Sequence, residues 1–332
     1  MTMTGTEPRE NIATAPLVRA DDLEVHFRSG GGLRPTRTVR AVDGVSLAVA
    51  PGETLGLVGE SGCGKSTLGR ALLRLLPLTS GTLSFEGQDI SGVRGARLRR
   101  LRADVQAVFQ DPLGSLNPRM TIADAVAEPL REFVGGDRRV RRERVRELFE
   151  MVGLDPNRMG AYPRQMSGGQ LQRVGIARAI AVDPKFIVAD EVVSALDVSV
   201  QAQIINLLVE LRERNGLSYV FIGHDVAVVR HISHRVAVMY LGKIMETGDA
   251  LSVFDHPRHP YTASLMSAVQ VPDPTRRREQ ISLQGELPSP TDVPSGCRFR
   301  TRCPFAQEQC ALEEPPLREV APGRQLACHF PL

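Results

Sequence analysis

The sequence predicts an α/β fold around a buried sheet. Residues 54–58, 186–189 and 218–222 are short apolar runs of the length expected for strands that are covered on both faces. Helical patterns follow the first two runs, over 68–76 and 200–215. Strands that alternate with helices in this way are typical of α/β domains.

Composition and charge indicate an ordinary globular chain. It has 332 residues, of which 42% are hydrophobic and 24% charged, enough for about two domains. The 41 basic and 38 acidic residues give a net charge of +3, which argues against nucleic acid as the main partner. No apolar run reaches the ~18 residues of a membrane-spanning helix, and residues 1–10 do not resemble a secretory signal. We expect a cytosolic chain that meets a membrane only through a partner protein.

The other elements follow from periodicity and turn residues. Residues 1–16 are expected to be disordered, and a glycine- and arginine-rich loop is expected over 28–40. Beyond about residue 251 proline and cysteine become frequent, which predicts a separate small C-terminal region. The further strand patterns lie at 17–27, 41–50 and 235–240, and the further helical patterns at 141–151 and 170–182.

A phosphate-binding loop joins the strand at 54–58 to the helix after it. Glycines let successive backbone N–H groups point at phosphate oxygens, and the helix adds its positive N-terminal end. Lys65 is expected to reach the β- and γ-phosphates of a nucleotide, and Ser66 to bind Mg²⁺. Cys63 is expected to be a packed residue without chemistry. The residues that match G-x-x-x-x-G-K-[ST] are Gly59, Glu60, Ser61, Gly62, Cys63, Gly64, Lys65, Ser66 and Thr67.

Two acidic residues end the apolar strand at 186–189. Asp190 is placed to hold Mg²⁺ directly or through water, and Glu191 to act as the general base that polarises the attacking water. A solvated acidic pair at a strand end is a common alternative. The apolar run before the pair and Ser194-Ala195-Leu196-Asp197 after it favour the catalytic interpretation.

Three further segments are weak signals when each is taken alone. A lone glutamine is usually a surface residue, and a lone histidine is usually structural. Their fixed order around the phosphate loop and the acidic pair makes them one consistent signal. The segments are Val108-Phe109-Gln110-Asp111-Pro112, Ser167-Gly168-Gly169-Gln170-Leu171 and Ile222-Gly223-His224-Asp225.

The complete set resembles the motifs of ATP-binding cassette (ABC) ATPases over residues 17–255, with a helical subdomain at about 111–172. The resemblance implies a P-loop NTPase core that hydrolyses ATP with Mg²⁺. It also implies a head-to-tail dimer, in which Ser167, Gly168 and Gly169 contact the γ-phosphate held by the partner's phosphate loop. The glycine-rich turn before a helix is itself a suitable anion site. Hydrolysis removes the γ-phosphate that bridges the two chains, so the dimer loosens.

The same resemblance implies roles for single residues. Gln110 would sense and help to bind Mg²⁺ and the γ-phosphate, and His224 would steady the γ-phosphate and the attacking water. Phe27 stands where this family stacks an aromatic ring on adenine, although a core phenylalanine at a strand end is the alternative. The expected catalytic residues are Lys65, Gln110, Glu191 and His224. The expected nucleotide contacts also include Gln170 and Asp197.

The C-terminal region, residues 256–332, narrows the resemblance to the ATPases of oligopeptide and dipeptide importers. Leu116-Asn117-Pro118-Arg119-Met120-Thr121 is similar to the second of the two ATPase subunits in such importers. This implies a partner ATPase subunit, two membrane permease subunits and an extracytoplasmic substrate-binding protein, with the chain on the cytoplasmic side of the inner membrane. The similar segments are His256-Pro257-Arg258-His259-Pro260-Tyr261-Thr262, Gly285-Glu286-Leu287-Pro288-Ser289-Pro290 and Ser295-Gly296-Cys297-Arg298-Phe299.

A cluster of cysteines marks the same region. A cytosolic setting disfavours structural disulfides, so metal ligands or buried thiols are expected. The spacings lack the C-x₂-C pairs that are usual for structural zinc. Pro304 directly after Cys303 is typical of ferredoxin-type ligation, and the resemblance implies a [4Fe–4S] cluster, with unliganded thiols and zinc as open alternatives. The cysteines are Cys297, Cys303, Cys310 and Cys328.

Two other functions stay open at this point. A soluble ABC protein of translation or DNA repair would usually carry two cassettes or long coiled-coil insertions, and the sequence has neither. A non-hydrolysing regulatory cassette is opposed by the intact Glu191 and His224. Within the importers, nickel or glutathione are alternative cargoes, because the cassette itself never contacts the cargo.

Overall fold

The computed structural model describes residues 15–30, 37–268 and 288–332. Most of the N-terminal segment expected to be disordered, part of the loop expected at 28–40, and Gly285, Glu286 and Leu287 of the tail motif lie outside these residues. Within the described residues there is no helix with the length and apolar character needed to cross a membrane.

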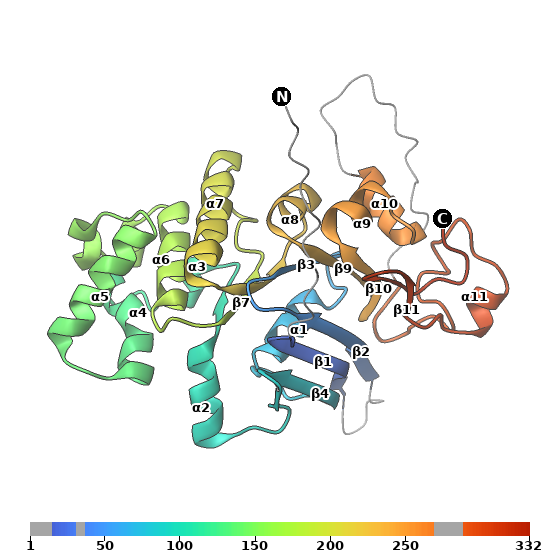
Figure 1. Cartoon of the computed structure of the whole chain (residues 1–332), viewed down its shortest axis with the longest axis horizontal. Helices are drawn as coiled ribbons and strands as arrows, with labels where there is room; N and C mark the ends of the chain where they lie inside the picture. Colours follow the sequence, from blue (N-terminus) through green and yellow to red (C-terminus); the bar gives the residue numbers. More distant parts are fainter. Residues whose placement is uncertain (1–14, 31–36, 269–287) are drawn as a thin grey trace, which may run out of the picture.

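An eight-stranded sheet forms the centre of the molecule (Figure 1). Its strands are β3 (Thr54–Val58), β6 (Val105–Val108), β7 (Phe186–Asp190), β8 (Ser218–Ile222), β9 (Arg235–Tyr240), β10 (Lys243–Asp249), β11 (Arg318–Ala321) and β12 (Arg324–Leu326). Their order is β11-β12-β10-β9-β3-β8-β7-β6. The five strands from β9 to β6 run parallel, and the other three join antiparallel. Parallel strands place their carboxyl ends, and the loops that follow them, at one edge of the sheet.

A smaller antiparallel sheet lies below the first in Figure 1. It consists of β1 (Val18–Ser29), β2 (Arg37–Val49), β4 (Ser80–Phe85) and β5 (Gln88–Asp89), in the order β2-β1-β4-β5. Helix α1 (Lys65–Leu72) packs between the two sheets. Its Gly69 faces Ile222 Cδ1 and Val188 Cγ1, which would lie 2.8 and 3.0 Å from an added Cβ. The helix that follows the phosphate loop is therefore held close to β7 and β8.

The opposite face of the central sheet is covered by α7 (Val198–Asn215) and α8 (Val226–Ile232) (Figure 1). Here β3 and α8 approach closely, because a Cβ at Gly56 would lie 2.5 Å from Val229 Cγ1. Val229 is itself fully buried. The strand that precedes Gly59 and the helix that follows His224 are thus packed against each other.

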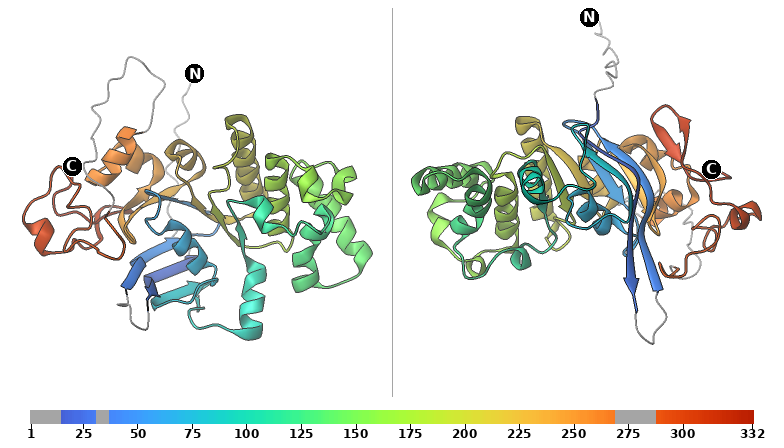
Figure 2. Two further views of the ribbon diagram at one scale, coloured as in Figure 1. Left: turned by 180° about the vertical axis from the view of Figure 1, so that it is seen from behind. Right: turned by 90° about the horizontal axis from the view of Figure 1, so that it is seen from below.

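A helical region lies at one end of the molecule (Figure 2). On α5, Val145, Leu148 and Phe149 are buried, at the spacing of one face of a helix. The last helix, α6, ends at Ile180, beyond the predicted end of the subdomain at 172. Helix α2 (Gly95–Asp104) precedes β6 and extends below this region in Figure 1. The elements of the region are α3 (Pro112–Ser115), α4 (Ile122–Pro129), a π-helical turn (Leu130–Val134), α5 (Arg138–Met151), two 3₁₀ turns (Pro156–Gly160 and Pro163–Gln165) and α6 (Gly168–Ile180).

The C-terminal region lies at the other end and is joined to the central sheet (Figure 1). Its β12 pairs with β10, so Glu246 lies opposite Leu326, and β11 forms the sheet edge. Arg324 Nη2 and Nε donate to Glu246 Oε1, and Glu246 is completely buried. The remaining helices are α9 (Ala250–Asp255), α10 (Pro260–Ala268) and α11 (Gln309–Leu312). Although a separate region was expected here, its strands extend the sheet of the core.

Comparison with the sequence shows where local pattern was sufficient. The strands expected at 54–58, 218–222 and 235–240 have these bounds in the structure. The helix expected at 68–76 instead starts at Lys65 and ends at Leu72, because Arg74 adopts a φ of 53° that a right-handed helix cannot continue. The domain boundaries at 17, 255 and 256 stay predictions.

Candidate functional site

The phosphate-binding loop holds its lysine in a closed arrangement. Lys65 is buried, and its Nζ donates to the carbonyl oxygens of Gly59 (2.7 Å) and Glu60 (3.0 Å). These oxygens satisfy the ammonium group where phosphate oxygens would otherwise do so. A nucleotide that enters the loop therefore has to compete for the donors of Lys65.

Two glycines of the loop are required by space as well as by conformation. Gly59 has a φ of 153°, and an added Cβ would lie 2.1 Å from the Met239 carbonyl oxygen. Gly64 has a φ of 109°, and its added Cβ would lie 2.0 Å from the Ala41 carbonyl oxygen. No side chain fits at either position. The loop can thus lie directly against β2 and β9.

The magnesium residues expected from the sequence are in contact. Ser66 Oγ donates to Asp190 Oδ1 at 2.9 Å, which joins the start of α1 to the end of β7. Burial raises the pKa of Asp190 above its usual 3.8, and the charge of Glu191 adds to this, whereas Ser66 and Lys65 oppose it. A carboxylate with a raised pKa next to a hydroxyl gains from a cation, because a divalent ion would offset the cost of its buried charge.

The expected general base has an unusual backbone. Glu191 has a φ of 49°, and its N–H donates to the Ile222 carbonyl at 3.0 Å, which fixes the turn after β7 to the end of β8. Its carbonyl accepts from Ser194 Oγ at 2.9 Å, and Gln110 Nε2 lies 3.3 Å from the same hydroxyl. A left-handed conformation at a non-glycine residue is a form of strain that is found at functional sites. Ser194 thereby connects the two expected catalytic residues, Gln110 and Glu191.

Lys65, Ser66, Gln110 and Glu191 line one open cavity of about 480 Å³, and Asp190 is outside this lining but contacts Ser66. Beside the loop it is lined by Phe27, Val39 and Arg40, with Gln110 and Glu191 on other walls. Phe27 is 42% exposed, so it is a surface ring at the cavity wall and not the core phenylalanine of the alternative interpretation. An exposed aromatic face beside a phosphate loop is suitable for stacking on a base. The cavity has the parts needed to bind a nucleoside triphosphate.

The glycine-rich segment before α6 lies outside the lining of this cavity. Ser167 caps the helix: its Oγ accepts from Gln170 N at 3.3 Å, and Gln170 Oε1 accepts from Ser167 N at 3.0 Å. Ser167 and Gly168 are exposed, and Gly169 is tight against Val200, whose Cγ1 would lie 2.6 Å from an added Cβ. This capping box leaves an exposed helix N-terminus that offers backbone N–H groups to an external anion.

Asp197 and His224 are also absent from the cavity lining. Asp197 caps α7 by accepting from Val200 N at 3.0 Å, and it lies next to the capping turn through Gly169 and Val200. His224 is exposed after the end of β8, beside β7, which ends in Asp190. The structure therefore brings Phe27, the loop, Gln110, Asp190 and Glu191 together, and leaves Asp197, His224 and Ser167 to Gln170 on the surface.

Residues of the C-terminal region reach the phosphate loop, which sequence reasoning missed. The Glu60 N–H donates to Tyr261 Oη at 2.8 Å, and Arg302 Nη1 donates to Glu60 Oε2 at 2.7 Å. Pro290 lines the cavity itself and accepts from Arg40 N at 3.4 Å. Tyr261 and Pro290 lie in motifs that the sequence had singled out only for their resemblance. Nothing local in those motifs indicates what their side chains contact.

The four C-terminal cysteines surround a small cavity together with His259, Phe299, Phe305 and Phe330. Burial raises the pKa values of Cys297 and Cys328 to about 11. Among the described residues, the ligand atoms of only one group of three or more His, Cys, Asp or Glu lie within 4.8 Å of one another: Glu24, His26 and Asp43. The structure describes all four cysteines of the cavity, and no three of their thiols lie within 4.8 Å of one another, whereas the tetrahedral ligands of one zinc ion are about 3.8 Å apart. The thiols therefore do not have the spacing of a zinc site.

Comparison with known proteins adds to this geometry. Residues 42–194 match the family model described as ABC transporter, and residues 245–310 match that of the oligopeptide/dipeptide transporter, C-terminal region. The oligopeptide transport ATP-binding protein OppF of Salmonella typhimurium is 52% identical over 91% of this chain and 92% of its own length. The chain belongs to the ABC transporter family. It is an ABC ATPase, the ATP-hydrolysing type of subunit in such transporters.

Other relatives of this ABC ATPase agree. The oligopeptide transport ATP-binding protein AppF of Bacillus subtilis is 51% identical over 93% of this chain and 95% of its own length. Among solved structures, the dimeric post-hydrolysis state of the ATP-binding cassette MJ0796 bound to ADP and Pi has a TM-score of 0.63, with 29% identity over 70% of this chain and 98% of that chain. The cbiO1 structure from Clostridium perfringens has a TM-score of 0.64, with 25% identity over 73% of this chain and 91% of that chain. The predicted α/β P-loop fold is confirmed.

Proposed function

We propose that this ABC ATPase is the subunit that energises an importer of oligopeptides or dipeptides. The observation that carries the proposal is the cavity where the phosphate loop, Gln110 and Glu191 meet, in a chain whose C-terminal part matches the oligopeptide/dipeptide transporter model. Relatives named as oligopeptide transport ATP-binding proteins are about half identical to it over most of its length. The cargo is inferred from these relatives alone, and nickel or glutathione are the alternatives to test.

ATP and Mg²⁺ occupy the cavity in this proposal. Lys65 gives up the Gly59 and Glu60 carbonyls and binds the β- and γ-phosphates, while Ser66 and Asp190 hold Mg²⁺. Glu191 polarises the attacking water as general base. Phe27 stacks on the adenine ring, and Gln110 reports the presence of Mg²⁺ and γ-phosphate.

A second ATPase subunit closes the cavity. In the single chain the Ser167 cap is exposed and lies outside the cavity lining, so it is available to the cavity of a partner. Asp197 and His224 are likewise exposed and lie outside the cavity lining. We infer a head-to-tail pair in which each chain supplies Ser167, Gly168 and Gly169 to the nucleotide of the other. Whether the pair consists of identical or different chains is a question for the experiment.

Membrane permease subunits bind beside Gln110 in this proposal. A groove of about 890 Å³ separates the β6 edge of the sheet from the helical region, and Phe109, Pro112 and Phe133 line it. Phe109 precedes Gln110 directly, so a helix pressed into the groove would act on the γ-phosphate sensor. This apolar groove with Arg131 and Glu132 at its rim is suitable for an amphipathic permease helix. It would hold the ATPase at the cytoplasmic face of the inner membrane, with the substrate-binding protein on the opposite side.

We also propose that the cavity lined by the four C-terminal cysteines holds a [4Fe–4S] cluster. Four cysteines on one cavity are the number that such a cluster needs, one for each iron. Their thiols are too far apart for one ion as they stand, whereas a cluster takes thiolates at wider spacing. The raised pKa values of Cys297 and Cys328 mean that bound metal would have to displace protons from them. Bound iron would supply a crosslink between segments that are far apart in the chain.

The test is uptake by the assembled transporter. The chain is expressed with the permease and binding-protein genes that neighbour its own, in cells that lack peptide importers, and uptake of labelled di- and oligopeptides is measured beside nickel and glutathione. Peptide uptake that disappears with Lys65→Ala supports the proposal. Uptake of nickel or glutathione but not of peptides would show that the proposed cargo is wrong. ATP turnover without any association with permeases would overturn the transport role.

A further inference from the structure

We propose that the C-terminal region forms part of the ATP site. In this inference Tyr261 and Arg302 are positioning residues: they hold the phosphate loop through Glu60 and so set the affinity for nucleotide. The inference depends on the proposed ATP cavity, and its test below separates the two.

Tyr261 holds the backbone of the loop. It lies near the start of α10 and is completely buried, and its Oη accepts the Glu60 N–H at 2.8 Å. The next peptide group along the loop carries the Glu60 carbonyl, which accepts from Lys65 Nζ at 3.0 Å. The backbone of Glu60 is therefore bound on one side by Tyr261 of the C-terminal region and on the other by Lys65 of the loop itself. An N–H that is bound outward in this way cannot turn inward, which keeps the loop in one shape.

Arg302 holds the side chain of the same residue. Its Nη1 donates to Glu60 Oε2 at 2.7 Å, and the side chains of Arg302 and Glu60 are only 9% and 22% exposed. A shielded pair is worth more than a surface pair, because water and salt screen it less. If Arg302 were absent, the Glu60 carboxylate would be half-buried without a cation and would move towards solvent, and the loop would move with it.

An aromatic cluster fixes the segments that carry Tyr261 and Arg302. The rings of Tyr240 and Tyr261 are 4.7 Å apart, and Phe299 packs on both at 5.4 and 5.3 Å. Because Tyr240 ends β9, this packing joins α10 and the cysteine segment directly to the central sheet. The position of Arg302 is thus determined by the fold and not by its own flexible side chain.

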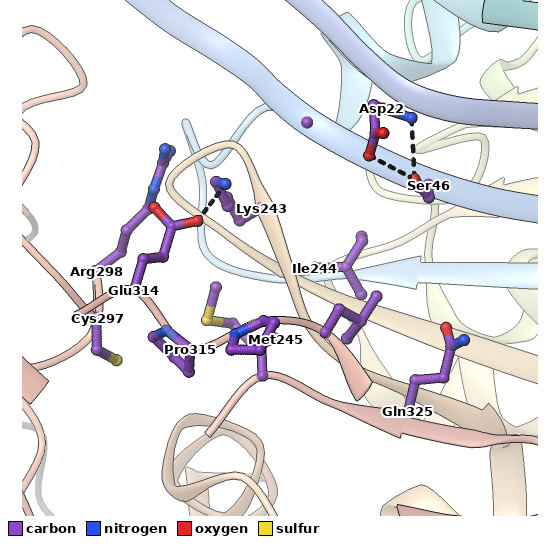
Figure 3. Close-up of a pocket in the computed structure, with 14 residues that line it drawn as sticks. Asp22, Ser46, Lys243, Ile244, Met245, Cys297, Arg298, Glu314, Pro315 and Gln325 are labelled. Atoms are coloured by element: carbon purple, nitrogen blue, oxygen red, sulfur yellow. Dashed lines mark hydrogen bonds and ion pairs between the residues drawn. The ribbon is translucent and has the colours of Figure 1, made fainter. Parts of the chain in front are cut away.

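A second set of contacts anchors the same segment. Arg298 is almost fully buried and donates to the Leu241 carbonyl and to Asp43 Oδ2. In Figure 3 Lys243, from the start of β10, is joined by a dashed line to Glu314 of the tail, beside Arg298 and Cys297. Burial alone would raise the pKa of Asp43, but Arg298 and His26 outweigh it and hold that pKa below its usual 3.8. Asp43 is therefore ionised and bound to the tail at neutral pH.

The tail also reaches the other side of the cavity. Pro290 lines it near Phe27 and accepts from Arg40 N at 3.4 Å. The contacts with Glu60 come from Tyr261 and Arg302, whereas the contact with Arg40 comes from Pro290, which belongs to a different segment of the C-terminal region. Together they indicate that the region is built around the nucleotide cavity.

The experiment measures nucleotide binding by the full-length chain. The dissociation constant of Mg²⁺–ADP, which is not hydrolysed, is determined by calorimetry for Tyr261→Phe, Arg302→Gln, Glu60→Gln and the double variant of the last two. We expect each single variant to weaken binding about threefold to tenfold, the effect of one hydrogen bond. The double variant should bind Mg²⁺–ADP as tightly as the weaker-binding of its two single variants, since each substitution removes the same Arg302–Glu60 ion pair. The KM for ATP should rise by the same factor, with kcat changed less than twofold.

Matched variants separate the possible explanations. Arg300→Gln changes an arginine two positions away that donates to the Ser295 carbonyl at 2.8 Å, and it should leave binding unchanged. Arg302→Lys should recover part of the affinity. Additive effects of Arg302→Gln and Glu60→Gln, or an equal loss in Arg300→Gln, would overturn the inference. If Tyr261→Phe does not fold, as seen by circular dichroism, the Arg302 and Glu60 cycle decides alone.

Lys65→Ala tells failure of the inference from failure of the proposed function. If Lys65→Ala abolishes binding while the tail variants bind normally, the cavity is the ATP site and only the positioning role is wrong. If Lys65→Ala binds Mg²⁺–ADP as tightly as the unchanged chain, the ATP cavity itself is wrongly placed, and the inference is lost with it.

Discussion

Ser66 Oγ lies 2.9 Å from Asp190 Oδ1, although the two residues are 124 positions apart in the chain. The contact exists because β3, which leads into the phosphate loop, and β7, which ends in Asp190, are both neighbours of β8. The carboxyl ends of parallel strands meet at one edge, so two distant motifs become one site. The hydroxyl and the carboxylate together make an oxygen-rich position of the kind that Mg²⁺ prefers.

Asp190→Asn should weaken the affinity of the ATPase for Mg²⁺, so that the Mg²⁺ concentration for half-maximal activity rises roughly 10–100-fold. In the unchanged chain the pKa of Asp190 is raised by burial, so protons compete with Mg²⁺ at a higher pH than at an ordinary aspartate. Activity titrations with Mg²⁺ at several pH values measure this. The apparent Mg²⁺ affinity should fall as the pH is lowered towards the raised pKa, and this pH dependence should be absent in Asp190→Asn.

The same raised pKa affects stability in the absence of metal. Since the folded state binds the Asp190 proton more tightly than the unfolded state, the free energy of unfolding should rise as the pH falls through the raised pKa. The stabilisation is gained between the raised pKa and the usual value of 3.8, and it is lost as the pH rises through the raised pKa. Thermal unfolding of the unchanged chain and Asp190→Asn, compared at each pH, isolates the effect. A difference between them that does not vary with pH would contradict the shift.

Glu191→Gln should reduce turnover by roughly 10²–10⁴-fold while ATP binding is kept, because the amide cannot accept the proton of the attacking water. The isosteric side chain leaves the strained turn, with its φ of 49°, in place. Phosphate release is measured together with the molecular mass in the presence of ATP, which should show a trapped pair of ATPase subunits. Glu213→Gln, an exposed glutamate on α7, is the control. Undiminished phosphate release would remove Glu191 from the role of base.

Ser167→Arg should abolish hydrolysis without loss of ATP binding. The serine is an exposed cap outside the cavity of its own chain, so the large side chain would block closure against a partner and not the cavity itself. Equilibrium binding of nucleotide and steady-state ATPase activity are measured on the same preparation. If binding and hydrolysis decline together, the serine acts within its own chain, and the proposed exchange between partners is wrong.

Phe299→Ala should lower the free energy of unfolding by about 3–5 kcal/mol, the usual cost of removing a fully buried phenylalanine. The ring is completely buried and contacts Tyr240 and Tyr261. Chemical denaturation measures the loss. Phe305→Ala is the matched control, since Phe305 is 45% exposed and should cost far less. Equal stability of Phe299→Ala and the unchanged chain would show that the tail does not dock on the sheet as described.

Iron and acid-labile sulfide, assayed on anaerobically purified protein, should be present in equal amounts if the cysteine cavity holds a [4Fe–4S] cluster. Cys303→Ser should lower both amounts and the visible absorbance. Cys63→Ser is the control, because Cys63 is buried in the phosphate loop and far from that cavity in the chain. Protein without iron, sulfide or visible absorbance would leave unliganded thiols as the state of these cysteines.

Elements with a strong local pattern were predicted well, and others were not. The strands at 54–58, 218–222 and 235–240 are apolar throughout or bounded by clear turns, and the structure keeps these bounds. The missed strand β4 contains Ser80 and Gly81 and is exposed at its start, so it has no continuous apolar pattern. The strands β11 and β12 are short, and they are strands only because β12 pairs with β10 and β11 pairs with β12.

The candidate site divides in the same way. Motif spacing was enough to select Lys65, Gln110 and Glu191, and the cavity contains all three. It was also enough to select His224 and Ser167, and the family resemblance already placed Ser167 on the nucleotide of a partner chain. Both residues lie outside the lining of their own chain's cavity. Tyr261 and Arg302 are the opposite case. They contact Glu60 across 201 and 242 positions of sequence, and no local spacing could indicate that.

The amino-acid sequence alone determined the fold class, the phosphate loop and the family, because these depend on residues that act with near neighbours along the chain. Tertiary structure alone decided that Ser66 meets Asp190, and that Tyr261 and Arg302 of the C-terminal region contact Glu60 of the phosphate loop. The physical reason is that packing and hydrogen bonding between distant segments depend on where the sheet places them, and strand order is not written in any one segment.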